Sequence, residues 1–316
     1  MHFLPSISVL ASVYQGEEYL PGFFENLQAQ TIFPETELVL VLNLPNAREK
    51  QLCRDFAAKH QKQVQVLQAP RLETLGASWN RAWRAARAPY LAPWNVDDRR
   101  VVDSLQRQAV ALDGEPEAVL CYGDYLRVAR YGEEQGELRQ TPAYSPGHFQ
   151  RAFAQGGAFW LLRAAVGEQA GYYDEQFRVA ADMDYSLRLA ALGLRMVRAE
   201  GLLGYFTDAA QGLSTRQGAT ESSVERTAVQ LRYGVFDKVD PAQLHAASAL
   251  RLEALASGSS WLPLSNFVPD LDAYLTRRQP LWKLGRLRHA VRAALQRSGL
   301  LPLLHRWQAR LFKREI

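Results

Sequence analysis

Hydrophobic residues follow two alternating spacings along the first part of the chain. Short β-rich apolar runs predict strands over Ile7–Val13, Leu38–Leu42, Val64–Leu67 and Tyr90–Trp94. Apolar residues at helical spacing predict helices over Glu17–Gln28, Asn46–Lys59, Gly76–Arg87 and Asp103–Leu112. Strands separated by helices indicate an α/β fold with a mainly parallel sheet, in which ligands bind beyond the carboxyl ends of the strands.

The alternation continues, and then changes, in the rest of the chain. A strand is predicted over Ala118–Val128, a glycine turn at 155–157 leads into Ala158–Arg163, and a helix is predicted over Asp182–Leu192. From about residue 221 the pattern is nearly all helical, interrupted by prolines. We therefore expect an α/β domain over 1–218, with halves of about 1–100 and about 101–218, and a helical C-terminal region over 219–316.

Composition narrows the class of protein. The 316 residues are 47% hydrophobic and 22% charged, which is enough apolar material for a large core. The two cysteines, Cys53 and Cys121, form no CxxC pair, so we expect a reducing compartment and no zinc site. No apolar run approaches the roughly 20 residues of a membrane span, and the N-terminus lacks the features of a signal peptide.

Charge is distributed unevenly. The net charge is +4, but residues 277–316 contain eleven Lys and Arg against one Glu. This tail also carries two apolar helical stripes, at positions 284, 287, 291, 295 and 300, 304, 307, 311. Such a basic amphipathic segment is suited to an anionic membrane surface, although the stripes could instead pack on the α/β domain. No fold or aromatic platform for nucleic acid is recognisable, so we expect no nucleic-acid partner.

The sequence lacks the common nucleotide-binding and hydrolase motifs, so its carboxylates are the remaining candidates for a functional site. The sequence has no G-x-G-x-x-G, no P-loop, no G-x-S-x-G and no clustered histidines. Asp97 and Asp98 directly follow the strand predicted over Tyr90–Trp94. Adjacent carboxylates there suit a hard divalent cation that bridges to phosphate oxygens. A solvated turn paired with Arg99 and Arg100, or a helix N-cap, is the alternative.

Four segments in order resemble the family 2 glycosyltransferases of the GT-A fold. They are Ile7–Leu20, residues 28–43, Gly76–Asp98 and Gly171–Arg188. The second contains Gln28-Ala-Gln-Thr31 and Glu37-Leu-Val-Leu-Val-Leu-Asn43, and the last contains G-Y-Y-D-E-Q-F and D-M-D-Y-S-L-R. The resemblance implies a Rossmann-like sheet flanked by helices, and transfer of a sugar from a nucleotide diphosphate to a glycan or lipid-linked acceptor.

The resemblance also implies a donor site. Its nucleotide-binding residues would be Ser12, Tyr14, Asn43, Asn80, Asn95 and Asp97. Asp97 would be the main ligand of Mg²⁺ or Mn²⁺, and Asp98 a second ligand or an orienter of bound water. Asn43, Asn95 and Ala181 stand where the family usually has carboxylates. A helix-surface role is the alternative for Asn80.

Asp182 is the residue that the resemblance implies as the general base of an inverting transfer. Asp184 competes for this role, but residues two apart on a helix point about 200° apart, so both cannot face the site. Asp184 is four residues from Arg188 and is expected to form an ion pair on the helix surface. We therefore favour Asp182, for which a structural N-cap is the alternative.

Further contacts to the donor sugar or acceptor are expected from Asp124, Gly156, Gly157 and Asp184. A simple turn aspartate and an ordinary glycine turn are the alternatives for Asp124 and the two glycines. Trp94 and Trp160 could stack on sugar faces or pack in the core.

The expected setting follows from the same resemblance. We expect a UDP donor ahead of GDP or dTDP, and a cytoplasmic protein, peripheral on the cytoplasmic face of the membrane, that builds cell-surface polysaccharide. The competing hypothesis is a catalytically degenerate sugar-nucleotide-binding or scaffold protein of the same fold, motivated by Asn43, Asn95 and Ala181.

Overall fold

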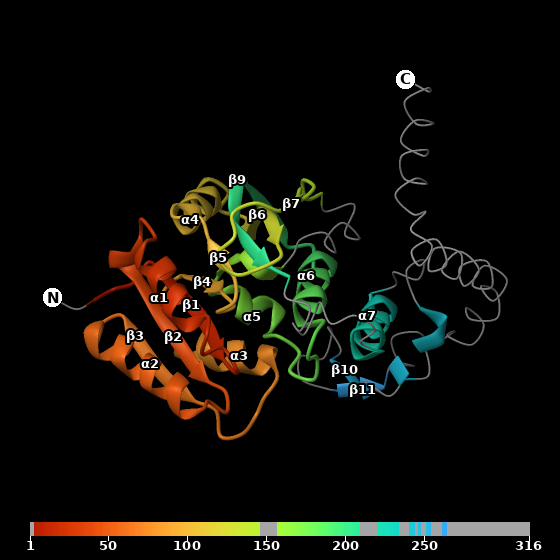
Figure 1. Ribbon diagram of the computed structural model, residues 1–316. Helices are drawn as coiled ribbons and strands as arrows, with labels where there is room; N and C mark the ends of the chain where they lie inside the picture. Colours follow the sequence, from red (N-terminus) through yellow and green to blue (C-terminus); the bar gives the residue numbers. More distant parts are fainter. Residues whose placement is uncertain are drawn as a thin grey trace, which may run out of the picture. The chain divides into compact units, whose positions relative to one another are not determined.

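The computed structural model (Figure 1) describes residues 3–145, 157–208, 220–233, 240–243, 246–247, 251–253 and 261–263. All of them belong to the first of two compact units of the chain, Met1–Leu264. Gly156 and the basic tail 277–316 lie outside the described residues.

Four parallel strands form the N-terminal half of the main sheet. Their bounds are β1 Ile7–Val13, β2 Thr36–Leu42, β3 Val64–Gln68 and β4 Tyr90–Pro93. β1 pairs with both β2 and β4, so it lies inside the sheet, and its apolar side chains are buried. The connecting helices are α1 Leu20–Gln28, α2 Ala47–Lys59 and α3 Leu75–Ala85, with the 3₁₀ turn η1 Phe33–Glu35 before β2.

The second half of the sheet is mixed. The strand order is β3-β2-β1-β4-β8-β6-β9-β5, and β7 pairs with β6. The strands of this half are β5 Arg99–Arg100, β6 Ala118–Val128, β7 Glu137–Arg139, β8 Leu161–Arg163 and β9 Arg195–Thr207. Helices and turns here are α4 Ser104–Gly114, η3 Gly157–Phe159, α5 Val166–Ala170, α6 Ala181–Ala191 and α7 Thr220–Arg232. β8 is antiparallel to both β4 and β6.

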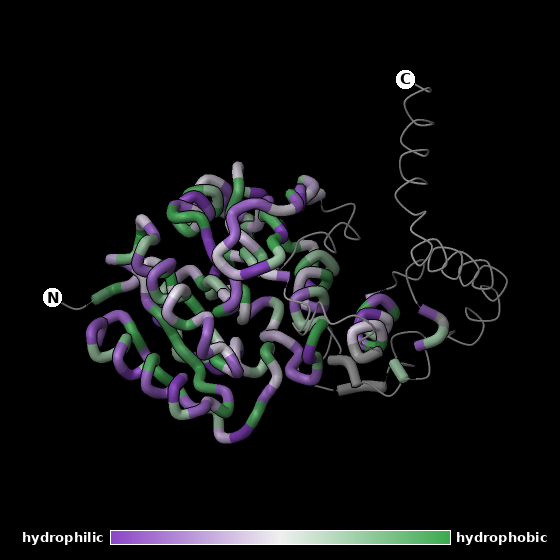
Figure 2. The backbone as a smooth tube through the Cα atoms, in the orientation of Figure 1, coloured by the Kyte–Doolittle hydropathy of each residue, from purple (hydrophilic) through white to green (hydrophobic). Residues whose placement is uncertain are grey.

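Helices cover both faces of the sheet. Alternate β1 residues such as Ile7 and Val9 join one buried cluster with Phe23 of α1, Phe56 of α2 and Leu105 of α4. The intervening β1 residues point to the opposite face, where α3 packs. The strands at the centre of the sheet are correspondingly coloured as hydrophobic in Figure 2. Both faces of the sheet are therefore buried along β1, β2 and β4, and polar chemistry is confined to the ends of these strands.

The α/β fold class is confirmed, and two expectations about later segments need correction. The 13-residue strand β9 was not predicted, because its two glycines and three charged residues break the apolar pattern. Beyond residue 221, some described segments depart from the helical expectation, and the rest of that region lies outside the described residues. These segments are the antiparallel strands β10 Arg251–Glu253 and β11 Trp261–Pro263, and the 3₁₀ turn η5 Pro241–Gln243. No helix within the described ranges is both long and apolar enough to cross a membrane.

Candidate active site

The loops that follow β1 and β2 are tied together by the N-terminus of α2. Glu49 lies in the first turn of α2 and is 1% exposed. Its Oε2 accepts the Asn46 N–H at 2.8 Å in a capping box, and its Oε1 accepts the Gly16 N–H at 2.6 Å. Asn46 in turn donates to Glu17 at 2.9 Å. One buried carboxylate thus fixes both loops at the carboxyl edge of the sheet.

Two residues of these loops adopt left-handed backbone conformations. Gln15 has φ of 51° and Leu44 has φ of 55°, and each lies two residues beyond the end of its strand. Neither is glycine, so each conformation costs about 1–3 kcal/mol and persists only because the surroundings impose it. Strain of this kind at a strand edge is typical of ligand-binding sites.

The predicted nucleotide residues occupy this edge in different ways. Ser12 is half-buried near the end of β1, and Tyr14 is 41% exposed just beyond it. Asn43 is buried, and its side chain is paired with the main chain of Glu73: Nδ2 donates to the carbonyl and Oδ1 accepts the N–H, both at 2.9 Å. The Asn43 amide therefore positions the loop before α3.

Asn80 lies in α3 and is 1% exposed. Its Oδ1 accepts the Tyr173 N–H, and its Nδ2 donates to the Tyr173 carbonyl and to Glu175, each at 2.9 Å. Asn80 therefore connects α3 to the segment that precedes α6. The helix-surface alternative is excluded by its burial.

Asp98 is an internal support of the turn after β4. It is 1% exposed, its Oδ1 accepts the Thr207 N–H at 3.0 Å and its Oδ2 accepts from Asn95 at 3.2 Å. Its carbonyl accepts the Trp94 indole N–H at 3.0 Å. Burial and the neighbouring Asp97 raise the pKa of Asp98 well above its usual value. Both Asp98 oxygens are thus occupied by protein donors.

Asp97 differs from Asp98 because its carboxylate is half-buried and unpaired. Apart from its own amide, no N–H, hydroxyl or cationic side chain in the described parts of the chain bonds to it. Burial raises the pKa of Asp97. A carboxylate without a cationic partner fits a divalent cation, which would compensate its charge. No group of three His, Cys, Asp or Glu side chains that could hold a metal ion occurs within those parts.

Asp124 of β6 is engaged in an ion pair. Its Oδ2 accepts from Arg198 of β9 at 2.6 Å, and its Oδ1 accepts the N–H and hydroxyl of Thr141 at 2.8 and 3.0 Å. Burial raises its pKa, but Arg198 and Thr141 outweigh burial and lower the pKa overall. Gly157 begins η3. Trp94 and Trp160 are at most 1% exposed, so both pack in the core.

The two aspartates of α6 have separate surroundings, as helical geometry requires. Asp182 is half-buried in the first turn, and its Oδ1 accepts the Met183 N–H at 2.7 Å. Asp184 is completely buried. It pairs with Arg188 at 2.6 Å as expected, but this pair lies in the interior and not on the helix surface. Asp184 therefore presents no exposed oxygen to a sugar.

Tyr125 of β6 is affected by the charges of both Asp182 and the turn after β4. Burial is the main cause of its raised pKa, and the negative charges of Asp182 and Asp98 raise it further. Both carboxylates therefore act on the same phenol. The sequence places these two aspartates 84 residues apart, and the fold brings both within electrostatic range of Tyr125.

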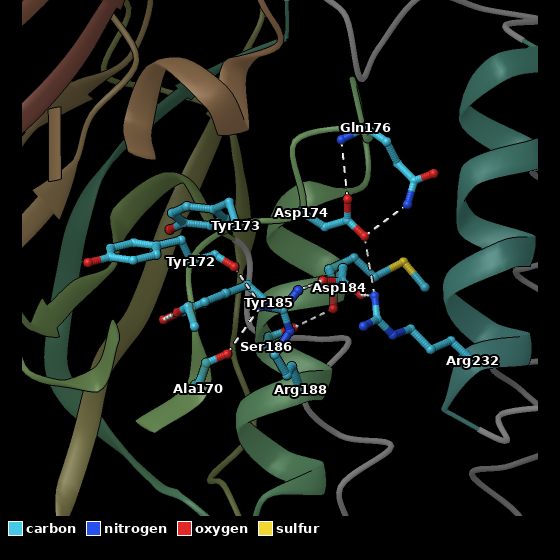
Figure 3. A network of polar contacts seen from close by, with 12 residues as sticks. Ala170, Tyr172, Tyr173, Asp174, Gln176, Asp184, Tyr185, Ser186, Arg188 and Arg232 are labelled. Carbon is cyan, nitrogen blue, oxygen red and sulfur yellow. Dashed lines mark hydrogen bonds and ion pairs between the residues drawn. The ribbon is translucent and has the colours of Figure 1, made fainter. Parts of the chain in front are cut away.

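A buried polar network supports α6 (Figure 3). Arg232 of α7 bridges Asp174 at 3.3 Å and Asp184 at 3.0 Å, and the Tyr233 hydroxyl donates to Asp184 at 3.1 Å. Arg188 also donates to main-chain carbonyls of the segment before α6. Burial, and then Asp184, raise the pKa of Asp174 to about 7. Sequence reasoning missed Arg232, because no local pattern joins it to α6.

The sequence matches the family described as Glycosyl transferase family 2 over residues 8–167, which is 160 of its 316 residues. No curated protein matches it significantly. Among solved structures, it resembles Staphylococcus aureus TarS 1-349 with a TM-score of 0.58 and 17% identity, covering 76% of this chain and 68% of that one.

Two ligand-bound structures are also similar to this chain. TarS 1-349 in complex with UDP-GlcNAc has a TM-score of 0.59 and 16% identity over 77% of this chain and 71% of that one. The mannosyltransferase PcManGT from Pyrobaculum calidifontis, in complex with GDP-Man and Mn²⁺, has a TM-score of 0.53 and 16% identity over 91% of this chain and 86% of that one. These likenesses establish the shared fold.

Proposed function

Because this chain belongs to glycosyl transferase family 2, we propose that it moves a sugar from a nucleotide-diphosphate sugar to a glycan or lipid-linked acceptor, with inversion at the anomeric carbon. The observation that carries this proposal is the Asp97 carboxylate beyond β4, which, apart from its own amide, pairs with no donor in the described parts of the chain. Asp182 supplies a second carboxylate, and its charge and that of Asp98 both act on Tyr125. An inverting transfer needs a base at the acceptor hydroxyl, and a metal-assisted transfer also needs a ligand that holds the cation at the diphosphate.

The donor would be held at the carboxyl ends of β1, β2 and β4. Asp97 would hold Mg²⁺ or Mn²⁺, which when bound supplies positive charge to the departing diphosphate. Ser12 and Tyr14 would contact the base and ribose. We expect UDP ahead of GDP or dTDP, and the similar structures with UDP-GlcNAc and with GDP-Man and Mn²⁺ support a nucleotide-sugar donor.

Asp182 would act as the general base. Its carboxylate would accept the proton of the acceptor hydroxyl while the hydroxyl oxygen attacks the anomeric carbon. Asp182 has one oxygen bonded to the Met183 N–H, which fixes the direction of the carboxylate. Asp184, sequestered by Arg188 and Arg232, would keep the first turn in place without reacting.

The decisive test is binding of UDP-GlcNAc and GDP-mannose, with and without Mn²⁺, to the wild type and to Asp97→Ala. We expect Mn²⁺-dependent binding of one donor that weakens at least about tenfold in Asp97→Ala, because the cation loses its protein ligand. Isothermal titration calorimetry measures the Kd. Asp55→Ala removes an exposed carboxylate of α2 and serves as the matched control.

Two outcomes would contradict the proposal in different ways. Equal Mn²⁺-dependent binding by Asp97→Ala and the wild type would show that Asp97 does not hold the cation. A wild type that binds none of the UDP, GDP, dTDP or CMP sugars would favour the degenerate scaffold instead.

We also propose that residues 277–316 hold the protein on an anionic cytoplasmic membrane face during synthesis of surface polysaccharide. The support is the charge of the segment, eleven basic residues against one acidic residue, together with its apolar stripes.

A further inference from the structure

Glu225 of α7 makes three hydrogen bonds with the turn that leads into α6. Its Oε1 accepts the Arg178 N–H at 2.9 Å, and its Oε2 accepts the N–H groups of Val179 at 2.7 Å and Ala180 at 2.9 Å. Glu225 is 4% exposed. Bonds from amides to a carboxylate are stronger than neutral ones, so this turn is held firmly against α7.

The local sequence gives the start of α6 no cap of its own. The N-cap residue is Ala180, which has no side-chain acceptor, and Ala181 follows it. Asp182 comes next, and its carboxylate is oriented by the Met183 N–H. Asp182 is the second residue of α6, so its backbone continues directly from the turn that Glu225 holds.

We propose that Glu225 is a positioning residue for the general base Asp182. This inference rests on the proposed function, since it requires Asp182 to be the base. Glu225 is buried and its two oxygens are occupied by amides, so it would touch neither donor nor acceptor. The family match ends at residue 167, so neither α6 nor α7 falls within it.

Other contacts between α6 and α7 allow the positioning role of Glu225 to be tested apart from any effect on folding. At the other end of α7, Arg232 bonds to Asp174 and Asp184, and Tyr233 bonds to Asp184. These contacts do not involve Glu225. Removal of its carboxylate should therefore loosen the turn before Asp182 while α7 stays attached to α6.

The experiment compares Glu225→Ala and Glu225→Gln with Asp182→Asn and with Arg226→Ala, an exposed neighbour on α7. The readouts are Mn²⁺-dependent hydrolysis of UDP-GlcNAc or GDP-mannose, the KM for that donor, and thermal unfolding. In Glu225→Ala we expect kcat to fall about 10- to 100-fold, because small displacements of a reacting group have effects of this size. We expect the donor KM to stay within about twofold.

Glu225→Gln keeps one acceptor oxygen, so its kcat should lie between those of Glu225→Ala and the wild type. Arg226→Ala should match the wild type. If Glu225→Ala does not fold, Glu225→Gln tests the proposal in its place, by the same expected result of a lower kcat with a nearly unchanged donor KM.

The inference is overturned if folded Glu225 variants keep the wild-type kcat, or if kcat, KM and unfolding temperature deteriorate together. Asp182→Asn separates this failure from a failure of the proposed function. If Asp182→Asn loses turnover while the Glu225 variants keep it, only the positioning role of Glu225 is contradicted. If the wild type shows no turnover, both the positioning role and the proposed function are contradicted.

Discussion

Gly204 of β9 occupies a place where no side chain fits. An added Cβ would lie 2.2 Å from Cε1 of Phe159 and 2.4 Å from the carbonyl oxygen of Arg99. Gly204 pairs with Arg100 of β5 and Tyr125 of β6, so it lies where the segment after Asp98 joins the sheet. A close approach of backbone to an aromatic ring is what the missing side chain permits.

The Gly204→Ala variant should therefore lose about 1–3 kcal/mol of unfolding free energy, because the extra methyl group overpacks β9 against η3. Urea denaturation measures this change. Gly114→Ala, at the end of α4 with nothing within 4 Å of the added atom, is the matched control. It should be neutral or slightly stabilising. Equal stabilities of the two variants would contradict the assigned contacts.

At the scale of elements, the support of α6 combines two carboxylates with two arginines in the interior. Burial, and then Asp184, raise the pKa of Asp174 to about 7. Its folded-state pKa thus exceeds the unfolded value near 3.9, and the native protein holds more protons than the unfolded chain between about pH 4 and 7. Stability from this group is complete below that window and is lost as pH rises through it.

We therefore expect the wild type to lose stability relative to Asp174→Asn as pH rises from about 4 to about 7, by at most about 1.4 kcal/mol per pH unit. Urea denaturation at several pH values measures the difference. A wild-type minus variant difference that is flat across this range would show that Asp174 titrates normally. Asp55→Asn, at an exposed site, should show no such slope.

The sequence predicted the parallel half of the sheet well, because its elements are specified locally. Apolar runs fix β1 to β4, and Asn46 with Glu49 marks the start of α2. The reach of Glu49 to Gly16 could not be predicted, since it depends on the pairing of β1 with β2. Nor could the burial of Asp184, whose partner Arg232 lies 48 residues later.

Asp98 and Asn80 illustrate why motif reasoning stops short of the site. Both belong to motifs that suggested ligand contacts, yet the structure bonds Asp98 to Thr207 and Asn80 to Tyr173. A sequence motif identifies a polar position but not its bonding partner. Whether the side chain bonds to ligand or to protein depends on its burial in the fold. Asp97 and Asp98 are adjacent in the sequence, and only their burial and bonding in the fold distinguish them.

At the scale of the whole molecule, charge separates the tail from the rest of the chain. Residues 277–316 carry a net charge of +10, counting eleven basic residues and one acidic residue, within a total of +4. Each basic residue near an anionic surface contributes about 1 kcal/mol. We expect the full chain to float with phosphatidylserine-containing liposomes, and a chain ending at residue 276 to float much less. Liposome flotation in low and high salt measures this, and equal flotation of both chains would contradict it.

The position of β8 has a consequence for the protein during its synthesis. β8 lies between β4 and β6, although it follows β6 in the chain. From the moment residue 93 leaves the ribosome until residue 163 follows, β4 has one edge without a partner. At about 5–20 residues per second this interval lasts roughly 4–14 s. An apolar strand edge left open for seconds is a template for wrong pairing, so nascent chains that end between these residues expose an edge that a chaperone would shield.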